Sequence, residues 1–197
     1  MLVLDRSRVS AEIAYRVAGL DADEKARLIM EAARADDSCS EDSLGLAPRW
    51  RLVLRVLGPR EAVRVVDALA SGVLWPDWAE RIYRENVNRY YDEIRRRTSI
   101  LTYEFDGVRV AVLIPPPRAS ACDVETVVEP PGGVDLVVVL YPRGISIRSL
   151  GRIRADCVAR KLGGGGHPKA AGAPRPSTTM GAGQVARMVA RAAEGCA

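Results

Sequence analysis

The stretch KLGGGGHPKAAG, residues 161–172, places four consecutive glycines directly before His167. His167 is the only histidine in the chain of 197 residues. Because glycine lacks a Cβ atom, it lets a ligand approach the backbone closely and leaves main-chain amides accessible as donors. The stretch is therefore either a flexible connection or a loop whose backbone binds a ligand. Its position between two expected helices favours the ligand-binding loop.

Polar side chains stand on the strand expected just before the loop, SIRS at residues 146–149. Side chains alternate between the two faces of a strand, so Ser146 and Arg148 are expected on one face and Ser149 on the other. The planar guanidinium of Arg148 suits a phosphate or a carboxylate, and His167 adds a hydrogen-bond donor. We therefore expect a phosphate-binding site. Its members are Ser146, Arg148, His167 and the main-chain amides of Gly164, Gly165 and Gly166.

Positive charge gathers around the loop. The chain has a net charge of +4, but residues 141–176 contain eight basic residues and one acid, so the rest of the chain carries −3. A basic island beside a glycine loop favours an anionic partner such as nucleic acid. An ordinary solvated face would have a similar composition. We expect Arg152, Arg154 and Lys169 to add general attraction toward a phosphate backbone.

The period of the apolar residues changes near residue 100. Upstream they recur at helical spacing, and downstream they alternate or form a continuous run. The sequence ILTYEFDGVRVAVLI, residues 100–114, predicts a hairpin with an Asp-Gly turn. The run VDLVVVL, residues 134–140, is typical of a buried central strand, and the segments 151–162 and 179–195 are expected to be helices.

The fold class predicted from this pattern is α/β. We expect a helical N-terminal half over residues 1–75, a linker helix over 76–97, and a C-terminal mixed-sheet α/β domain over 98–197. Within the first half, helices are expected in 7–20, 21–35, 49–57 and 59–72.

The cysteines and the apolar runs indicate the compartment. The four cysteines lie far apart with no C-x-x-C pair, which argues against a zinc knuckle or a dense disulfide framework and favours single thiols. No apolar run reaches the roughly 18–20 residues that span a bilayer, and the first residues lack a signal-peptide core. A cytoplasmic protein with no membrane partner is therefore expected.

The segment GGGGHPKAAG and the SIRS strand before it resemble the glycine-loop signature of the DHHA1 domain of DHH-superfamily phosphoesterases. RecJ-type exonucleases, oligoribonucleases and bisphosphate nucleotidases belong to that superfamily. The DHHA1 domain of alanyl-tRNA synthetases is less similar, because its loop lacks the histidine and the double alanine. The resemblance covers about residues 98–195. It implies that residues 98–197 hold a nucleic-acid or nucleotide substrate and that residues 1–75 are a helical remnant of a catalytic DHH domain.

In that family a separate DHH domain performs hydrolysis with metal ions held by several carboxylates and histidines, including an Asp-His-His triplet. This chain has no such triplet and a single histidine. By the resemblance, Asp37 falls where the family has a late metal-binding aspartate, so Asp37 is the one weak metal candidate. We therefore expect no catalytic residue and no cofactor.

The leading hypothesis from the sequence is a non-catalytic RecJ-like protein that binds single-stranded nucleic acid or its phosphate end. Such a protein would serve DNA replication or repair and contact a protein partner of the replication complex through its helical half. Two alternatives stay open. One is a manganese- or magnesium-dependent oligoribonuclease or nucleotide phosphoesterase whose metal site is missing from this chain or completed by a partner. The other is an interaction module that keeps the glycine loop only as scaffolding.

Overall fold

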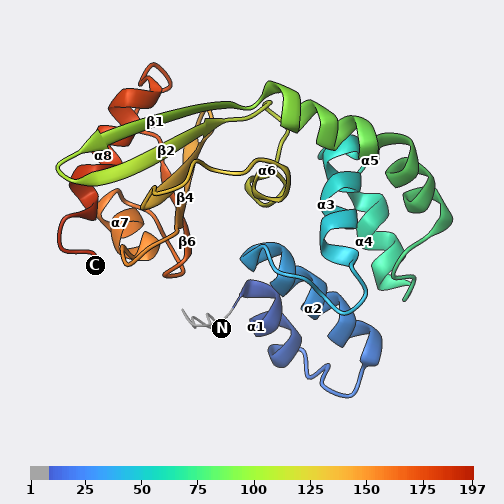
Figure 1. The fold of residues 1–197 in the computed structure, drawn as a ribbon. Helices are drawn as coiled ribbons and strands as arrows, with labels where there is room; N and C mark the ends of the chain where they lie inside the picture. The colour runs from blue at the N-terminus through green and yellow to red at the C-terminus, as the bar shows by residue number, and fades with distance from the viewer. Residues whose placement is uncertain (1–8) are drawn as a thin grey trace. The chain divides into compact units, whose positions relative to one another are not determined.

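The change of period near residue 100 coincides with the change from helices to strands in the computed structural model, which describes residues 9–197 (Figure 1). Within these residues, five helices are followed by a six-stranded sheet and three further helices. The predicted α/β class with a helical N-terminal half is confirmed. The chain divides into two compact units, one up to Tyr90 and one from Tyr91 to Ala197. No helix in the described part combines the length and the apolarity needed to cross a bilayer.

The first unit is helical, and residues 1–8 of the expected segment 1–75 lie outside the described residues. Its helices are α1 Ser10–Val17, α2 Glu24–Ser38, α3 Leu46–Leu57, α4 Val63–Ala70 and most of α5, Asp77–Arg97. Asp23 begins α2 by accepting a hydrogen bond from the Ala26 amide at 3.0 Å. Helix α4 starts later than expected, because residues 59–62 form a turn.

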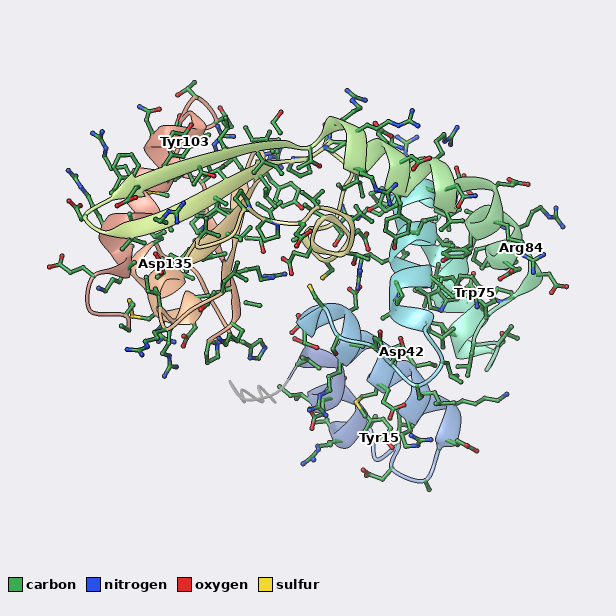
Figure 2. All side chains as sticks on the ribbon, viewed as in Figure 1. Tyr15, Asp42, Trp75, Arg84, Tyr103 and Asp135 are labelled. Atoms are coloured by element: carbon green, nitrogen blue, oxygen red, sulfur yellow. A yellow bond between two sulfur atoms is a disulfide. The ribbon has the colours of Figure 1, made fainter. Side chains whose placement is uncertain are left out.

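Tryptophan side chains form the core of the first unit. The rings of Trp50 and Trp75 meet edge to face with centroids 4.8 Å apart, and Trp78 lies 5.9 Å from Trp50. The indole N–H of Trp50 donates to the Leu74 carbonyl at 3.1 Å. The guanidinium carbon of Arg49 lies 4.5 Å from the centre of the Trp75 ring, and Trp75 is labelled in Figure 2. Trp78, in the first turn of α5, therefore stabilises this unit together with Trp50 and Trp75.

A mixed sheet forms the second unit. Its strands are β1 Ser99–Phe105, β2 Val108–Ile114, β3 Leu136–Leu140, β4 Gly144–Ser149, β5 Gly165–Gly166 and β6 Ala170–Pro174, in the order β1-β2-β3-β4-β6-β5. Strands β2 and β3 are parallel, and all other neighbours are antiparallel. The predicted Asp-Gly turn joins β1 to β2, and both Asp106 and Gly107 have positive φ, as a two-residue hairpin turn requires.

Helices lie on both sides of this sheet. Helix α7 (Ala155–Lys161) and helix α8 (Ala182–Ala193) pack on one face over Val110, Val138 and Ile147, which are fully buried. Helix α6 (Ala121–Val127) lies in the crossover from β2 to β3. Its Glu125 pairs with Arg148 of β4, which points to the face opposite that of Ile147, so α6 lies on the opposite side of the sheet from α7 and α8. The face of β4, β6 and β5 opposite α7 therefore carries the polar residues singled out from the sequence.

The glycine stretch forms a hairpin that the sequence analysis did not predict. Strand β5 pairs with β6, and His167 and Ala170 exchange main-chain hydrogen bonds of 2.7 and 3.1 Å across the turn. The sequence AAGAP has little strand propensity, which is why β6 was missed. Its small residues are nevertheless required, because Ala171 and Ala173 fill narrow space in the core below α7.

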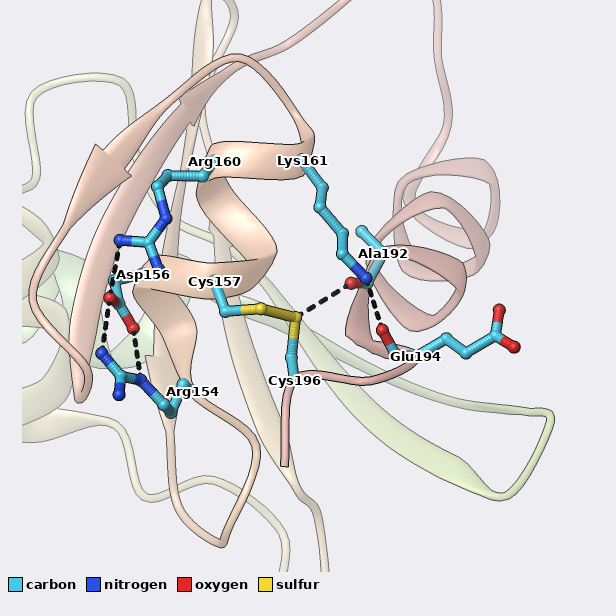
Figure 3. Close-up of a disulfide and its surroundings, with 8 residues drawn as sticks. All are labelled: Arg154, Asp156, Cys157, Arg160, Lys161, Ala192, Glu194 and Cys196. Carbon is cyan, nitrogen blue, oxygen red and sulfur yellow. Dashed lines mark hydrogen bonds and ion pairs between the residues drawn. A yellow bond between two sulfur atoms is a disulfide. The ribbon is translucent and has the colours of Figure 1, made fainter.

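A disulfide corrects the expectation of single thiols. Cys157 on α7 is bonded to Cys196 beyond the end of α8, with a Cα–Cα distance of 5.7 Å and a sequence separation of 39 residues (Figure 3). The two cysteines are distant in sequence, so no spacing rule finds the pair. The bond fastens the C-terminal residues to α7.

Gly164→Ala is expected to destabilise the protein by about 2–3 kcal/mol, because the added methyl would overlap its surroundings. Its Cβ would lie 2.0 Å from the Gly172 carbonyl oxygen and 2.6 Å from Ala173 Cα. Gly165→Ala is the matched control, since a Cβ there meets nothing within 4 Å. Urea unfolding of the two variants beside the wild type measures the difference. Equal stability of both variants would contradict the packing of the hairpin.

Candidate phosphate-binding site

The polar residues predicted to act together lie on one face of the sheet. Ser146 stands opposite Gly172 on β6, and Gly172 stands opposite Gly165 on β5. Directly opposed residues share a face, so these three form one row across the strands.

The second row brings together His167 and Arg148. Arg148 stands opposite Ala170, and Ala170 stands opposite His167 at the end of the hairpin. Two spacings between strands separate Arg148 from His167, which is about 10 Å between backbones. Only the methyl group of Ala170 stands between them in the row. The structure thus places Ser146, Arg148 and His167 around a floor of Gly165 and Gly172.

Arg148 is held by two neighbours. Its Nη1 donates to Ser146 Oγ at 3.0 Å, which confirms that the two side chains share a face. Its Nε lies 2.6 Å from Oε1 of Glu125 on α6, and 14% of the Arg148 side chain is exposed. The carboxylate neutralises much of the charge that Arg148 offers an anion. A bound phosphate would therefore compete with Glu125 for the guanidinium.

Glu125 and Gly172 are the members of the site that sequence reasoning missed. Nothing in the spacing of the short segment around Glu125 indicates that it pairs with a strand residue 23 positions later. Gly172 belongs to the quoted glycine stretch, and recognition of β6 as a strand would have placed it opposite Ser146.

The main-chain amides of Gly164, Gly165 and Gly166 differ in their hydrogen bonds. Gly164 donates its N–H to the Ala159 carbonyl at 2.8 Å, so this amide ends helix α7. His167 and Ala170 are a hydrogen-bonded pair, and such pairs alternate along an antiparallel ladder. Gly165 is therefore at a hydrogen-bonded position, and the N–H of Gly166 points to the edge of the sheet. Gly166 is the loop glycine whose amide is best placed to meet a ligand.

The basic residues expected to attract a backbone have different roles. Arg154 donates from Nε and Nη2 to the two carboxylate oxygens of Asp156 at 3.1 and 2.9 Å, and Arg160 adds a bond of 2.8 Å (Figure 3). Lys169 Nζ lies 3.3 Å from the Gly151 carbonyl, and Arg152 is exposed in the adjoining loop. Arg152 and Lys169 therefore remain on the surface beside the hairpin.

Asp156 shows the effect of this pairing on its own titration. Asp156 is only 3% exposed. Hydrogen bonds from Arg154 lower the pKa of the carboxyl most, those from Arg160 lower it further, and the result is a pKa of about 2 despite burial. Asp156 thus stays ionised in any neutral buffer and fixes both guanidinium groups.

The weak metal candidate Asp37 lies exposed near the end of α2. The neighbouring Asp36 pairs with Arg51 at 2.6 Å. Across residues 9–197, no group of three or more histidine, cysteine, aspartate or glutamate residues is arranged to hold a metal ion. Asp37 is therefore not a member of a metal-binding group within the described residues.

No protein-family model matches the chain, and no curated protein matches it. Solved structures give weak likenesses. The pGpG-specific phosphodiesterase PggH from Vibrio cholerae has 12% identity and a TM-score of 0.46, covering 94% of this chain and 73% of that one. An exopolyphosphatase-related protein from Bacteroides fragilis has 19% identity and a TM-score of 0.38, covering 70% of this chain. This chain spans 44% of the length of the Bacteroides protein.

A further likeness is to the DHH domain of a member of a family of ribosomal proteins, with 15% identity and a TM-score of 0.31, covering 94% of this chain and 44% of that one. Every one of these TM-scores lies below 0.5, too low to assign a fold family. Only the sequence motif at residues 146–172 therefore points to the DHH superfamily.

The pairing of Asp156 predicts how stability changes in acid. The carboxyl has a pKa of about 2 in the folded chain against its usual value of 3.8. Its contribution is therefore complete above pH 3.8 and is lost as the pH falls toward 2. At neutral pH, Asp156→Asn should unfold at a lower urea concentration than the wild type. Between pH 3.8 and pH 2 its free energy of unfolding should fall by less than that of the wild type.

Asp67→Asn, at an exposed position on α4, is the control for the same change of charge. It should leave the acid dependence of stability as in the wild type. An Asp156→Asn variant with the full wild-type dependence would show that another group carries it.

Proposed function

We propose that this chain is a DHHA1-like protein that binds the phosphate groups of single-stranded nucleic acid and does not hydrolyse them. The observation that carries the proposal is the shared face of Ser146, Arg148 and His167 around Gly165 and Gly172. A hydroxyl and a guanidinium are in contact there, and His167 lies on the same face with its backbone about 10 Å from that of Arg148, beside two residues that have no Cβ atom. Such a surface lets a phosphate reach both side-chain donors and the main chain.

In this proposal Arg148 binds the phosphate and Ser146 orients the guanidinium. His167 donates from the other side of the Ala170 methyl, and Gly166 supplies its outward N–H. Glu125 holds Arg148 in place in the unliganded protein and is displaced when phosphate binds. Arg152 and Lys169 add attraction along the backbone of the strand.

The proposal assigns no catalytic residue to this chain. Hydrolysis with two metal ions needs several carboxylates and histidines around the metals, whereas the chain has one histidine and residues 9–197 contain no such group. We place the protein among accessory factors of DNA replication or repair, with the helical first unit as its contact to a protein partner. This role rests on the resemblance to RecJ-like proteins.

A cytoplasmic location is part of the proposal. The disulfide between Cys157 and Cys196 bears on it, because disulfides are rare in the cytosol of mesophiles and frequent in intracellular proteins of hyperthermophiles. The location is thus consistent with the disulfide in a hyperthermophilic cell.

Binding of fluorescein-labelled single strands should be salt-dependent and should need the site. Arg148→Ala combined with His167→Ala is expected to weaken binding by about tenfold or more, because two donors to a charged group are lost. Glu125→Gln is expected to strengthen binding several-fold, because the competing charge is removed. Fluorescence anisotropy at two salt concentrations measures both effects, on DNA and on RNA.

Arg55→Gln combined with Arg60→Gln, at exposed positions of the first unit, is the control for general charge. Unchanged affinity in the Arg148 and His167 double variant, with normal folding, would remove the site from the account. Incubation of the same strands with manganese or magnesium tests the enzymatic alternative. Release of nucleotides, abolished by Asp37→Asn, would mean that a metal site exists and that this chain is a phosphoesterase.

A further inference from the structure

A groove lies on the other side of the sheet, away from the row of Ser146 and Arg148. The end of β1, the solvent side of α8 and the end of α7 line it, and its volume is about 870 Å³. It is an open groove at the edge strand of the described sheet, not a closed cavity. Of its ten lining residues, only Lys161 and Leu162 belong to the stretch 146–172.

Two aromatic rings form one wall of the groove. Tyr103 and Phe105 are on the same face of β1, with ring centroids 6.2 Å apart and planes only 10° from parallel. Both are half-buried. Gly183 on α8 makes room for Tyr103, because a Cβ at Gly183 would lie 3.2 Å from the ring. The ring therefore packs directly against the backbone of α8 at Gly183.

Three cations line the rest of the groove. The guanidinium carbon of Arg187 lies 4.9 Å from the centre of the Phe105 ring, and Arg191 follows one turn later on α8. Lys161 stands at the end of α7, where its ammonium donates to the Glu194 carbonyl. No carboxylate side chain lines the groove, and within the described residues none of these three cations pairs with one.

This contrasts with the island around the glycine hairpin. There Glu125 neutralises Arg148, and Asp156 holds Arg154 and Arg160. Arg187 and Arg191 are exposed and carry their full charge into the groove. Four residues separate them, which is about 6 Å along a helix axis, close to two nucleotides of a stacked strand at about 3.4 Å each.

We propose that this groove is a second binding surface for single-stranded nucleic acid, in which bases stack on Tyr103 and Phe105 and phosphates meet Arg187, Arg191 and Lys161. Parallel aromatic rings beside a cationic wall are what sequence-tolerant binding of single strands uses. An arginine layered on an aromatic ring adds a flat cation on which a base can stack. The groove extends the proposed function from one phosphate site to several nucleotides of a nucleic-acid strand. The inference depends on the residues of the groove itself and not on the phosphate site.

Charge and aromatic geometry favour this occupant over an acidic peptide. A peptide would use the unpaired edge of β1 and would gain little from two parallel rings, whereas nucleobases match their planes. The peptide is nevertheless a defined outcome of the experiment, with poly-glutamate as the competitor.

The test uses the whole chain and an oligothymidylate of roughly 20 nucleotides, longer than the 4–16 that one single-strand-binding domain typically covers. Arg187→Gln combined with Arg191→Gln should lower the affinity by about tenfold and reduce the slope of log affinity against log salt by about 1.4, since each phosphate contact contributes about 0.7. Arg55→Gln combined with Arg60→Gln should leave both values unchanged. Both arginines of the groove are exposed, so the double variant should fold normally.

Photo-crosslinking identifies the surface directly. A strand that carries bromouracil should crosslink to the segment with Tyr103 and Phe105, and Tyr103→Leu should abolish that crosslink. Wild-type affinity and slope in the Arg187 and Arg191 double variant would overturn the inference, as would displacement of the strand by poly-glutamate at equal charge concentration. Loss of binding in that variant but not in Arg148→Ala with His167→Ala would keep the groove and remove the phosphate site. The reverse pattern would remove the groove.

Discussion

The close approach of the glycine hairpin to β6 is the constraint on which the C-terminal unit depends. At Gly164 and Gly166 a side chain would meet the backbone of β6 at 2.0 and 2.5 Å, so these positions admit no Cβ. The hairpin is fastened at both ends of α7, by the Gly164 amide to the Ala159 carbonyl and by the Ala155 amide to the Pro168 carbonyl, each at 2.8 Å. Through this fastening His167 is held in register with Arg148. The glycines thus determine where the backbone of His167 lies, because they allow the hairpin to pack closely against β6.

The acids of the second unit decide where its positive charge is available. Glu125 and Asp156 each hold arginines of the island that the sequence showed as nearly all basic. A buried or half-buried ion pair contributes modestly to stability but holds the two side chains in a defined geometry. Among the described residues, no aspartate or glutamate lines the groove that holds the cations of α8 and of the end of α7. Charge counted along a sequence is therefore a poor guide to charge on a surface.

Much of the fold was predictable because its signals are local. The Asp-Gly turn, the apolar run of β3 and the helical periods follow from residue spacing, and the structure has elements at each of them. The shared face of Ser146 and Arg148 also followed from alternation along one strand. The pairing of β5 with β6 could not be predicted, since it depends on the contact of small residues with α7, not on strand propensity. The long-range partners had no local signal either, because Glu125 reaches Arg148, and Cys157 reaches Cys196, only after the chain has folded.

The central claim is that His167 and Arg148 bind one phosphate-bearing strand together. His167 is the only histidine, so its ring gives a single set of imidazole signals in a nitrogen-15 NMR spectrum. Addition of an oligothymidylate with a 5′-phosphate should shift these signals at the concentration at which the strand binds, and Arg148→Ala should remove the shift. Imidazole signals that stay in place while the strand binds would contradict the claim.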